Sequence, residues 1–261
     1  MTVLRVAVIG ARGRMGQEVR SVLAEHPAAT LGPCFDRDAL PTENIASVQS
    51  LPERSVEFDV AIDFTTAAAA AEVFALSRNA QRPLVTGTTG LGDDEWSALR
   101  ALAEEQPVVH APNMSVGVNL LFHLAKIATA LAGPDFDAEL VEMHHRHKRD
   151  APSGTAVRLA EIVREAKGFS ASALSHGRSG DVGPRPREEI GVMTLRGGSV
   201  IGDHTLILAG EDEVVELSHR AGRRRIFARG AVRAANWISG KAPGIYGMDA
   251  VLGLTGDSRE I

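Results

Sequence analysis

The sequence predicts an α/β protein in which a doubly wound parallel sheet is combined with a second, mixed α/β domain. Up to residue 110, short apolar runs alternate with segments of helical periodicity, which is the pattern of βαβ units. After residue 113, short strand-like runs are separated by glycine turns instead. The length of 261 residues also favours two domains, at roughly 150 residues for each.

The first half begins with an apolar, β-branched run from Val3 to Ile9 without polar alternation, typical of a strand buried on both faces. The run stops at Gly10, and a helix with apolar residues at helical spacing extends from Met15 to His26-Pro27. Further strands are predicted at 30–35, 56–64, 83–86 and 108–110, and helices at 67–77 and 93–104. This order predicts right-handed βαβ units and an open parallel sheet.

The second half opens with a helix from Ser115 to Leu131. Leu120, Leu124, Ile127 and Leu131 recur there with the period of an amphipathic helix, and polar residues between them argue against a membrane span. The prediction continues with a strand at 137–143, a helix at 153–167, a loop at 176–189, strands at 190–195, 204–208 and 213–218, and a helix at 223–237. We expect the last three strands to form an antiparallel sheet and the tail at 240–254 to pack on the first domain.

Composition and charge exclude several classes of function. Hydrophobic residues make up 44% of the chain and charged residues 23%, as in globular proteins. The net charge of −5 provides no overall positive field for nucleic acid or an anionic membrane, so we expect neither as a partner. The single cysteine, Cys34, cannot form an intramolecular disulfide, which favours a reducing, cytoplasmic location.

A glycine-rich turn between the first strand and the first helix is the first candidate site. Gly10, Gly13 and Gly16 have the spacing G-x-x-G-x-x-G. The first glycine permits the tight turn, the second lets the backbone approach a pyrophosphate, and the third allows close packing of helix on strand. A purely structural turn is the alternative, but the position in a βαβ unit favours a nucleotide.

Asp36 and Arg37 follow the predicted second strand, 20 residues beyond Gly16. An acid at this place bonds the adenosine ribose hydroxyls, whereas a guanidinium recruits a 2′-phosphate. Arg14 is also near in sequence, so we expect both NADH and NADPH to be accepted. The alternative is a solvated surface pair.

Two further segments end strands of the predicted sheet. Gly87-Thr88-Thr89-Gly90 follows one strand, and Ala111-Pro112-Asn113-Met114 follows the next. Ligands bind at the carboxyl ends of the strands in such folds, so we expect these segments to contact the nicotinamide side of the cofactor. A plain β-turn and a domain linker are the alternatives.

The densest signal is a basic run after the strand at 137–143. His144, His145, Arg146, His147 and Lys148 are five potential cations in a row, and Pro152-Ser153-Gly154-Thr155 then begins a helix. Cations facing the free N–H groups of a helix N-terminus suit an acidic substrate, and the histidines and the lysine can serve as proton donors. A solvated charge run is the alternative. We expect no metal, because neighbouring Arg and Lys oppose a cation.

The remaining basic residues carry no functional prediction. His26, His110, His123 and His219 stand singly and read as surface or core residues, and the run from Arg223 to Arg225 reads as a solvated helix start.

Together these motifs resemble the 4-hydroxy-tetrahydrodipicolinate reductase (dihydrodipicolinate reductase) family. The matching segments are 8–16, 63–65, 87–90, 113–119, 142–156, 176–178, 196–198 and 227–248. The resemblance implies a Rossmann-like dinucleotide-binding domain of residues 1–113 and 225–261. It also implies a mixed α/β substrate and oligomerisation domain of residues 114–224 that forms a homotetramer.

The resemblance further implies NADH- or NADPH-dependent reduction of a small dicarboxylate cyclic imine, with loss of water, in the diaminopimelate route to lysine. It assigns proton donation to His144 and Lys148, and substrate binding to His145, Gly154 and Thr155. It assigns cofactor contacts to Gly10, Ala11, Arg12, Gly13, Arg14, Met15, Asp36, Arg37, Gly87, Thr88, Thr89, Ala111, Pro112, Asn113 and Met114. Two alternatives stay open, an amino-acid or imino-acid dehydrogenase of the same fold and a non-catalytic dinucleotide-sensing module.

Overall fold

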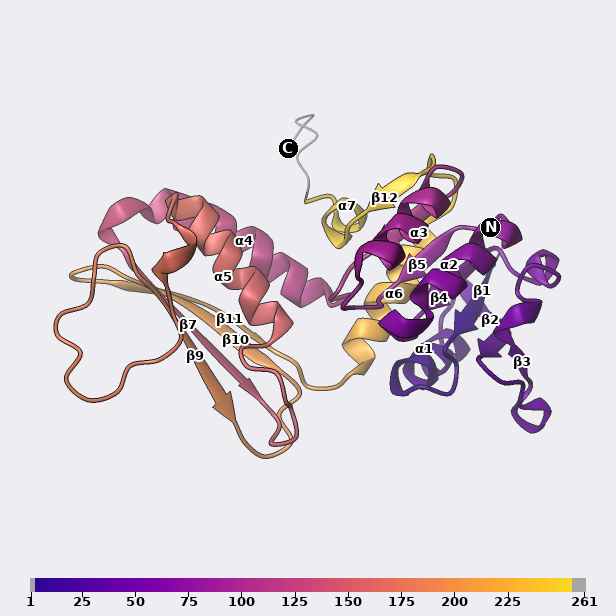
Figure 1. Cartoon of the computed structure of the whole chain (residues 1–261), viewed down its shortest axis with the longest axis horizontal. Coiled ribbons are helices and arrows are strands. Elements are labelled where there is room, and N and C mark those ends of the chain that lie inside the picture. Colours follow the sequence, from indigo (N-terminus) through magenta and orange to yellow (C-terminus); the bar gives the residue numbers. More distant parts are fainter. Residues whose placement is uncertain (1–2, 255–261) are drawn as a thin grey trace. The chain divides into compact units, whose positions relative to one another are not determined.

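The computed structural model describes residues 3–254 and divides the chain into two compact units (Figure 1). One unit contains the chain up to Val116 and again from Arg224 onward, and the other is Gly117–Arg223. Residues 1–2 and 255–261, which we assigned to the first domain, lie outside the described residues. The binding roles predicted for the two domains stay predictions.

The first unit is built on a parallel sheet of seven strands. The strands are β1 (Leu4–Ile9), β2 (Ala29–Asp36), β3 (Ile45–Ser47), β4 (Val60–Asp63), β5 (Leu84–Thr86), β6 (Pro107–His110) and β12 (Gly244–Tyr246). Their order is β12-β6-β5-β4-β1-β2-β3, and every pair is parallel. The order reverses between β1 and β4, as in a doubly wound sheet, so the predicted fold class is confirmed.

Helices cover both faces of this sheet. They are α1 (Arg14–Ala24), α2 (Ala67–Ala80), α3 (Asp93–Ala103), α6 (Arg225–Ile238) and α7 (Met248–Leu252). Val6 and Val8 of β1 pack in one core with α1 and α6, whereas Ala7 and Ile9 pack in another with α2 and α3. Both faces of β1 are therefore buried, which explains its lack of polar alternation. The tail packs on this unit as predicted, because β12 pairs with β6.

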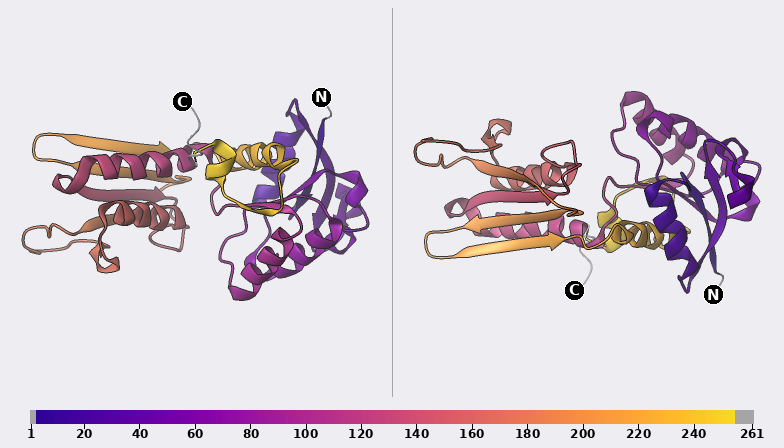
Figure 2. Two further views of the ribbon diagram at one scale, coloured as in Figure 1. Left: turned by 90° about the horizontal axis from the view of Figure 1, so that it is seen from above. Right: turned by 90° about the horizontal axis from the view of Figure 1, so that it is seen from below.

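The second unit is a mixed sheet with helices α4 (Val116–Ala132) and α5 (Gly154–Lys167) on one face (Figures 1 and 2). Its strands are β7 (Asp137–His144), β8 (Leu174–Ser175), β9 (Ile190–Arg196), β10 (Asp203–Ala209) and β11 (Val214–Arg220), in the order β11-β10-β7-β9-β8. The expectation that the last three strands form one antiparallel sheet is confirmed for β10 and β11, which pair antiparallel, and is wrong for β9. β7 lies between β9 and β10 and is parallel to β9, because the connection from β9 to β10 passes around the end of β7.

Short segments account for the other differences from prediction. The strand predicted at 56–64 begins only at Val60, because residues 55–57 form a 3₁₀ turn. The short strands β3 and β8 were not predicted. Further 3₁₀ turns lie at 41–43, 48–50, 133–135 and 171–173.

The face of α4 that contacts the core is not the one marked by its leucines. Its buried residues are Val118, Leu121, Ala125 and Thr129. The predicted repeat, Leu120, Leu124, Ile127 and Leu131, lies on the exposed side, with Leu131 82% exposed. This helix is apolar on two sides, so its period alone did not determine which side is buried.

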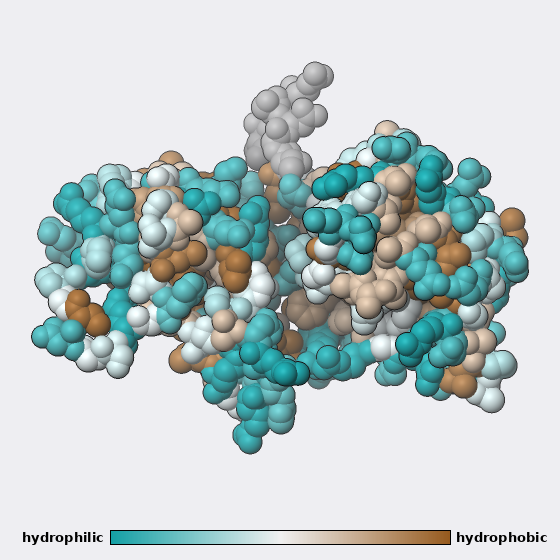
Figure 3. All heavy atoms as spheres, in the orientation of Figure 1, coloured by the Kyte–Doolittle hydropathy of each residue, from teal (hydrophilic) through white to brown (hydrophobic). Residues whose placement is uncertain are grey.

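The same helix is the one described segment that is long and apolar enough to cross a membrane, over Val116–Asp135, and 22% of that window is buried. Length and composition alone are weak evidence, since core helices pass the same test. On the face drawn in Figure 3, the surface of the unit that contains β7 is mainly polar, with apolar side chains between the polar ones.

Candidate active site

The glycine turn after β1 has the conformation that a nucleotide-binding turn needs. Gly10 has a φ of +77°, which favours glycine. A Cβ on Gly16 would lie 2.2 Å from the carbonyl oxygen of Gly10, so only glycine permits this approach of α1 to the turn. Gly13 is the N-cap of α1, which places the N–H groups of the first helical turn at the end of β1.

The backbone N–H groups of the turn are not all available to a ligand. Gly10 and Ala11 donate to the carbonyl oxygen of Phe35, at 2.9 and 3.0 Å. Arg12 donates to Asp36 Oδ2 at 2.9 Å. The N–H groups of Arg14 and Met15, the first residues of α1, have no partner within the helix and are therefore the ones an anion can use.

A cavity of about 290 Å³ lies beside this turn, at the lower limit of the size range of small-ligand pockets. It brings together four of the predicted cofactor residues, Gly10, Gly13, Asp36 and Arg37. The rest of its lining, residues 9, 48, 64–66, 69, 72 and 73, was not predicted. The cavity combines apolar walls with two carboxylates, those of Asp36 and Glu72, and one guanidinium. The carboxylate of Asp36 beside the glycine turn fits the adenosine end of a dinucleotide.

Asp36 and Arg37 differ in how firmly they are held. Both carboxylate oxygens of Asp36 accept backbone N–H groups, from Arg12 and from Arg37 at 2.9 Å each. The Arg37 side chain is 91% exposed and lies 3.6 Å from the carboxylate of Asp38. Asp36 thus has a fixed orientation, whereas Arg37 is free to move toward a ligand.

A buried carboxylate organises the carboxyl ends of β4 and β5. Asp63 is fully buried and accepts the hydroxyl protons of Thr86 and Thr88, at 2.7 and 3.0 Å, and the N–H of Thr65. A Cβ on Gly87 would lie 2.2 Å from the ring of Phe64. The side chain of Thr88 is therefore engaged within the fold, and a cofactor would meet the backbone of this segment.

The segment from Ala111 to Met114 is buried at its two ends, whereas Pro112 is exposed. Met114 is 1% exposed and its side chain belongs to the core with α6. Asn113 Oδ1 accepts the N–H of Ser115 at 2.9 Å. The structure thus places 87–90 and 111–114 after adjacent strands, as predicted, but Met114 can offer only its backbone to a ligand.

In the second unit, the candidate site lies at the carboxyl end of β7. Side chains alternate along this strand, and those facing the helices are Ala138, Leu140, Glu142 and His144. The first two belong to the hydrophobic core. The last two are polar and lie where the core meets the N-terminus of α5. The alternation of side chains along β7 therefore continues into the site, where polar residues take the place of apolar ones on the face toward the helices.

Glu142 is 1% exposed and has a full set of donors. Arg196 donates to both carboxylate oxygens at 2.9 Å each, and the N–H of Ser153 donates at 3.0 Å. Burial alone would raise the pKa of Glu142, but these hydrogen bonds and the one with His144 outweigh it and lower the pKa. Glu142 is thus a buried carboxylate for which no role was predicted.

His144 Nδ1 lies 2.5 Å from Glu142 Oε2. Burial lowers the pKa of His144 below its ordinary value, although Glu142 opposes this, and Lys148 lowers it further. A second histidine that the sequence analysis did not single out, His204 on β10, stacks edge to face on His144 with ring centroids 5.2 Å apart. The pair could have been found only from the strand register, which puts His204 opposite Glu142.

His204 is 4% exposed and connects the pair to α5. Its Nε2 lies 3.0 Å from Ser153 Oγ, which also accepts the N–H of Ala156 as the N-cap of α5. Burial, followed by the nearby His144, lowers the pKa of His204 to about 4. His204 is therefore neutral at neutral pH.

The predicted substrate residues surround this buried set. His145 is half-buried, and its Nδ1 has no partner within residues 3–254. The Lys148 ammonium is 2.9 Å from Asp150. Gly154 and Thr155 are the first residues of α5, with Gly154 exposed. In the described part of the chain, no three His, Cys, Asp or Glu residues are placed to hold a metal ion.

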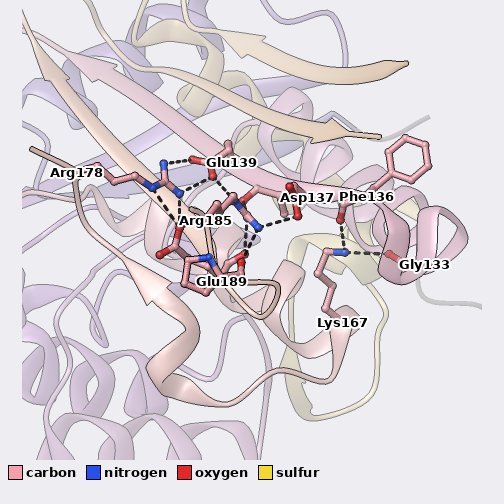
Figure 4. Close-up of polar contacts among 10 residues, drawn as sticks. Gly133, Phe136, Asp137, Glu139, Lys167, Arg178, Arg185 and Glu189 are labelled. Carbon is pink, nitrogen blue, oxygen red and sulfur yellow. Dashed lines mark hydrogen bonds and ion pairs between the residues drawn. The ribbon is translucent and has the colours of Figure 1, made fainter. Parts of the chain in front are cut away.

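Two other predictions can be compared with the structure. Arg225 is not simply solvated, because it donates to Glu25 and to Ser21 Oγ, at 2.7 and 2.9 Å. The loop at 176–189 is held on the face of the sheet away from the helices. There Arg178 and Arg185 bond Glu139, and Arg178 also bonds Glu189 (Figure 4).

Comparisons with known proteins agree with this geometry. Residues 4–114 match the family description "Dihydrodipicolinate reductase, N-terminus" and residues 117–252 match "Dihydrodipicolinate reductase, C-terminus". The 4-hydroxy-tetrahydrodipicolinate reductase of Hahella chejuensis is 42% identical over 96% of this chain and 99% of its own. That of Anaeromyxobacter dehalogenans (strain 2CP-C) is 44% identical over 97% and 98%.

Solved structures show the same relation. A dipicolinate-bound dihydrodipicolinate reductase from Paenisporosarcina sp. TG-14 has a TM-score of 0.75 and 25% identity, and covers 94% of this chain and 98% of its own. The diaminopimelate dehydrogenase of C. glutamicum, with a TM-score of 0.58 and 15% identity over 97% and 96%, shares the fold alone.

Proposed function

This chain belongs to the dihydrodipicolinate reductase family, and from that premise we propose how its residues carry out the reaction. It is an oxidoreductase that reduces 4-hydroxy-tetrahydrodipicolinate to tetrahydrodipicolinate in lysine biosynthesis, with NADH or NADPH as the cofactor. The identity of 42 to 44% with reductases, against 15% with a diaminopimelate dehydrogenase, favours this function over an amino-acid dehydrogenase.

The observation that carries the proposal is the polar end of β7 beside the N-terminus of α5. The substrate is a cyclic imine with two carboxylates, so its site must offer cations and N–H groups. We assign one carboxylate to the N–H groups of Gly154 and Thr155, where the helix dipole favours an anion. His145 supports this assignment, because its Nδ1 is buried and has no partner in the described part of the chain.

His144 and Lys148 are assigned to proton transfer. Replacing the 4-hydroxyl with hydride releases water, so one proton must be supplied in each turnover. A protonated imidazole and an ammonium near one another can supply it. Lys148 contacts Asp150, which is largely exposed, so the ammonium can turn to a substrate without leaving a buried carboxylate unpaired.

The cofactor is assigned to the first unit. Bound NADH or NADPH supplies the hydride. The N–H groups of Arg14 and Met15 bind the pyrophosphate, Asp36 receives the ribose hydroxyls, and Arg37 contacts a 2′-phosphate when one is present. Gly87, Thr89 and Ala111 to Asn113 contact the nicotinamide half. The exposure and freedom of Arg37 support the use of both cofactors.

We further propose a cytoplasmic homotetramer. The exposed apolar side of α4, with Leu120, Leu124, Ile127 and Leu131, supports contact between copies of the chain, since apolar stripes of this kind are rarely left to solvent. The single cysteine, which is buried and free, fits a reducing compartment. Analytical ultracentrifugation of the purified chain tests the tetramer directly, and a monomer at micromolar concentration would contradict it.

The function itself is tested with a coupled assay. Dihydrodipicolinate synthase generates the substrate, and loss of the reduced nicotinamide absorbance is followed with NADH and with NADPH. We expect turnover that depends on the synthase. Cofactor binding without turnover would instead support a dinucleotide-sensing module, and faster oxidation of an amino acid would support a dehydrogenase.

A further inference from the structure

Glu142 is a charged side chain in a place where charge is costly. Moving a carboxylate from water into a protein interior is unfavourable unless donors surround it. Arg196 and the N–H of Ser153 provide three such hydrogen bonds, and Thr194 Oγ1 adds a longer one of 3.3 Å. These donors come from β9 and from the residue that caps α5. The carboxylate is thus fixed from two sides, and its remaining contact is with His144.

The contact with His144 determines where the imidazole carries its proton. An ionised carboxylate can only accept hydrogen bonds, so the ring nitrogen that faces it must be protonated. That nitrogen is Nδ1, at 2.5 Å from Oε2. In the neutral imidazole the other nitrogen, Nε2, then has a free lone pair, and it is the atom that gains and loses a proton.

Nε2 of His144 is the atom left for a substrate. It has no hydrogen-bond partner among residues 3–254. A Cβ on Gly202 would lie 2.9 Å from it, so glycine at this position keeps the space beside Nε2 open. The ring is also fixed laterally by the edge-to-face contact with His204. The imidazole therefore has one orientation and one free nitrogen.

Strand pairing builds this arrangement. In the register of the sheet, Glu142 lies opposite Thr194 on one side and His204 on the other, and His144 lies opposite Arg196. Glu142, which orients His144, and His204, which fixes its ring, are therefore cross-strand neighbours on one face of the sheet. Separate segments of the chain supply them, and each is held by backbone hydrogen bonds.

We propose that Glu142, fixed by Arg196 and by the N–H of Ser153, is the positioning residue of the reaction: it holds His144 as the Nδ1–H tautomer and leaves Nε2 to exchange protons with the substrate. The inference rests on the proposed function of His144. The competing explanation is that Glu142 and Arg196 are only a structural ion pair that stabilises the sheet.

The first test is spectroscopic and needs no activity. Long-range ¹H–¹⁵N correlation spectra of protein labelled in its histidines distinguish the two neutral tautomers, and the His144 signals are assigned by their absence in His144→Gln. We expect the Nδ1–H tautomer at neutral pH. The Nε2–H tautomer in the unmodified protein would overturn the proposal, whether or not any variant folds.

The second test is Glu142→Gln. The glutamine oxygen is expected to face Arg196 and Ser153, which turns the amide NH₂ toward His144 Nδ1 and favours the opposite tautomer. We expect kcat to fall on the order of 10²- to 10⁴-fold, as for an acid or base held in the wrong tautomer. KM should change by less than about threefold, because the hydrogen bonds of Glu142 are with Arg196, Thr194, Ser153 and His144 and not with the N–H groups assigned to the substrate carboxylate.

The matched control is Glu139→Gln on the same strand. Glu139 also bonds arginines, Arg178 and Arg185, but its side chain lies on the opposite face of the sheet. If these carboxylate–arginine pairs only stabilised the sheet, kcat should fall to a similar extent in the two variants. The proposal instead predicts a loss of kcat only in Glu142→Gln. Equal kcat in both folded variants, or an unchanged His144 tautomer in Glu142→Gln, would overturn it.

Failure of the proposed function gives a different result. An unmodified protein that shows the Nδ1–H tautomer but does not turn over the dipicolinate precursor would leave the positioning of His144 intact and remove the assigned reaction.

Discussion

The buried neutral histidine, His204, should make the second unit less stable as the pH falls. Burial and then His144 lower its pKa to about 4, with His219 and Lys148 acting in the same direction and Glu142 opposing them. An exposed histidine titrates near 6.5. Between these two values the unfolded chain binds a proton that the folded chain does not, so protonation favours unfolding.

The size of the effect follows from the two pKa values. For a single site, we take a pKa of about 4 in the folded chain and about 6.5 in the unfolded chain. Proton linkage then lowers the free energy of unfolding by about 2 kcal/mol between pH 7 and pH 5, and by about 3 kcal/mol by pH 4. The stabilisation is fully present above about pH 6.5 and is lost as the pH falls toward the folded pKa. Carboxylates with lowered pKa values, such as Glu142, act mainly below this window.

The assay is amide hydrogen exchange of β10, measured by mass spectrometry and corrected for intrinsic rates, which reports the local opening free energy. Both tryptophans, Trp96 and Trp237, lie in the first unit, so their fluorescence does not report on β10. His204→Gln keeps a partner for Ser153 but cannot titrate, and exposed His176→Gln is the control. We expect the change in the opening free energy of β10 between pH 7 and pH 5 to be about 2 kcal/mol smaller in His204→Gln than in the unmodified protein. In His176→Gln this change should be the same as in the unmodified protein. The same pH dependence in both variants would refute the reasoning.

Three further predictions concern the site and the core. Lys148→Ala should lower kcat by about 10²- to 10⁴-fold with NADH affinity intact; near-normal turnover would remove Lys148 from the mechanism. Arg37→Ala should weaken NADPH more than NADH in binding titrations, because only NADPH has a 2′-phosphate; equal losses would contradict that role. Gly230→Ala on α6 would place a Cβ 1.7 Å from the carbonyl oxygen of Met114, a backbone atom. Gly230→Ala should lower the free energy of unfolding, measured with urea and tryptophan fluorescence, by about 3 kcal/mol or more. Arg229→Ala, at the exposed neighbouring position, should change this free energy little.

The parallel sheet could be predicted because its signals are local. A strand buried on both faces, as β1 is from Val6 to Ile9, must be apolar there, and the glycine turn after it has a spacing set by close backbone approach. The pairing of β9 could not be predicted in the same way. Which strand lies beside it depends on the path of the connection around the end of β7, and neighbouring residues do not encode that path.

The site shows the same division. The basic run at His144 to Lys148 and the start of α5 are contiguous and were found from the sequence. His204 and the role of Arg196 were not, because cross-strand register brings them to Glu142 from 50 or more residues away. The apolar repeat of α4 was predicted from Leu120, Leu124, Ile127 and Leu131, but Val118, Leu121, Ala125 and Thr129 are the residues buried in the core.

The pairing of β12 with β6 has a consequence for how the protein forms during synthesis. The edge strand β12, and α6, which packs on β4, β5 and β6, leave the ribosome only after the whole Gly117–Arg223 unit has emerged. The Gly117–Arg223 unit is contiguous and able to fold as it appears. The amino-terminal part of the other unit must wait, with its β6 edge and the α6 side of its core uncovered, until β12 and α6 have been made. During translation, the nascent amino-terminal region is therefore the part that most needs protection by chaperones.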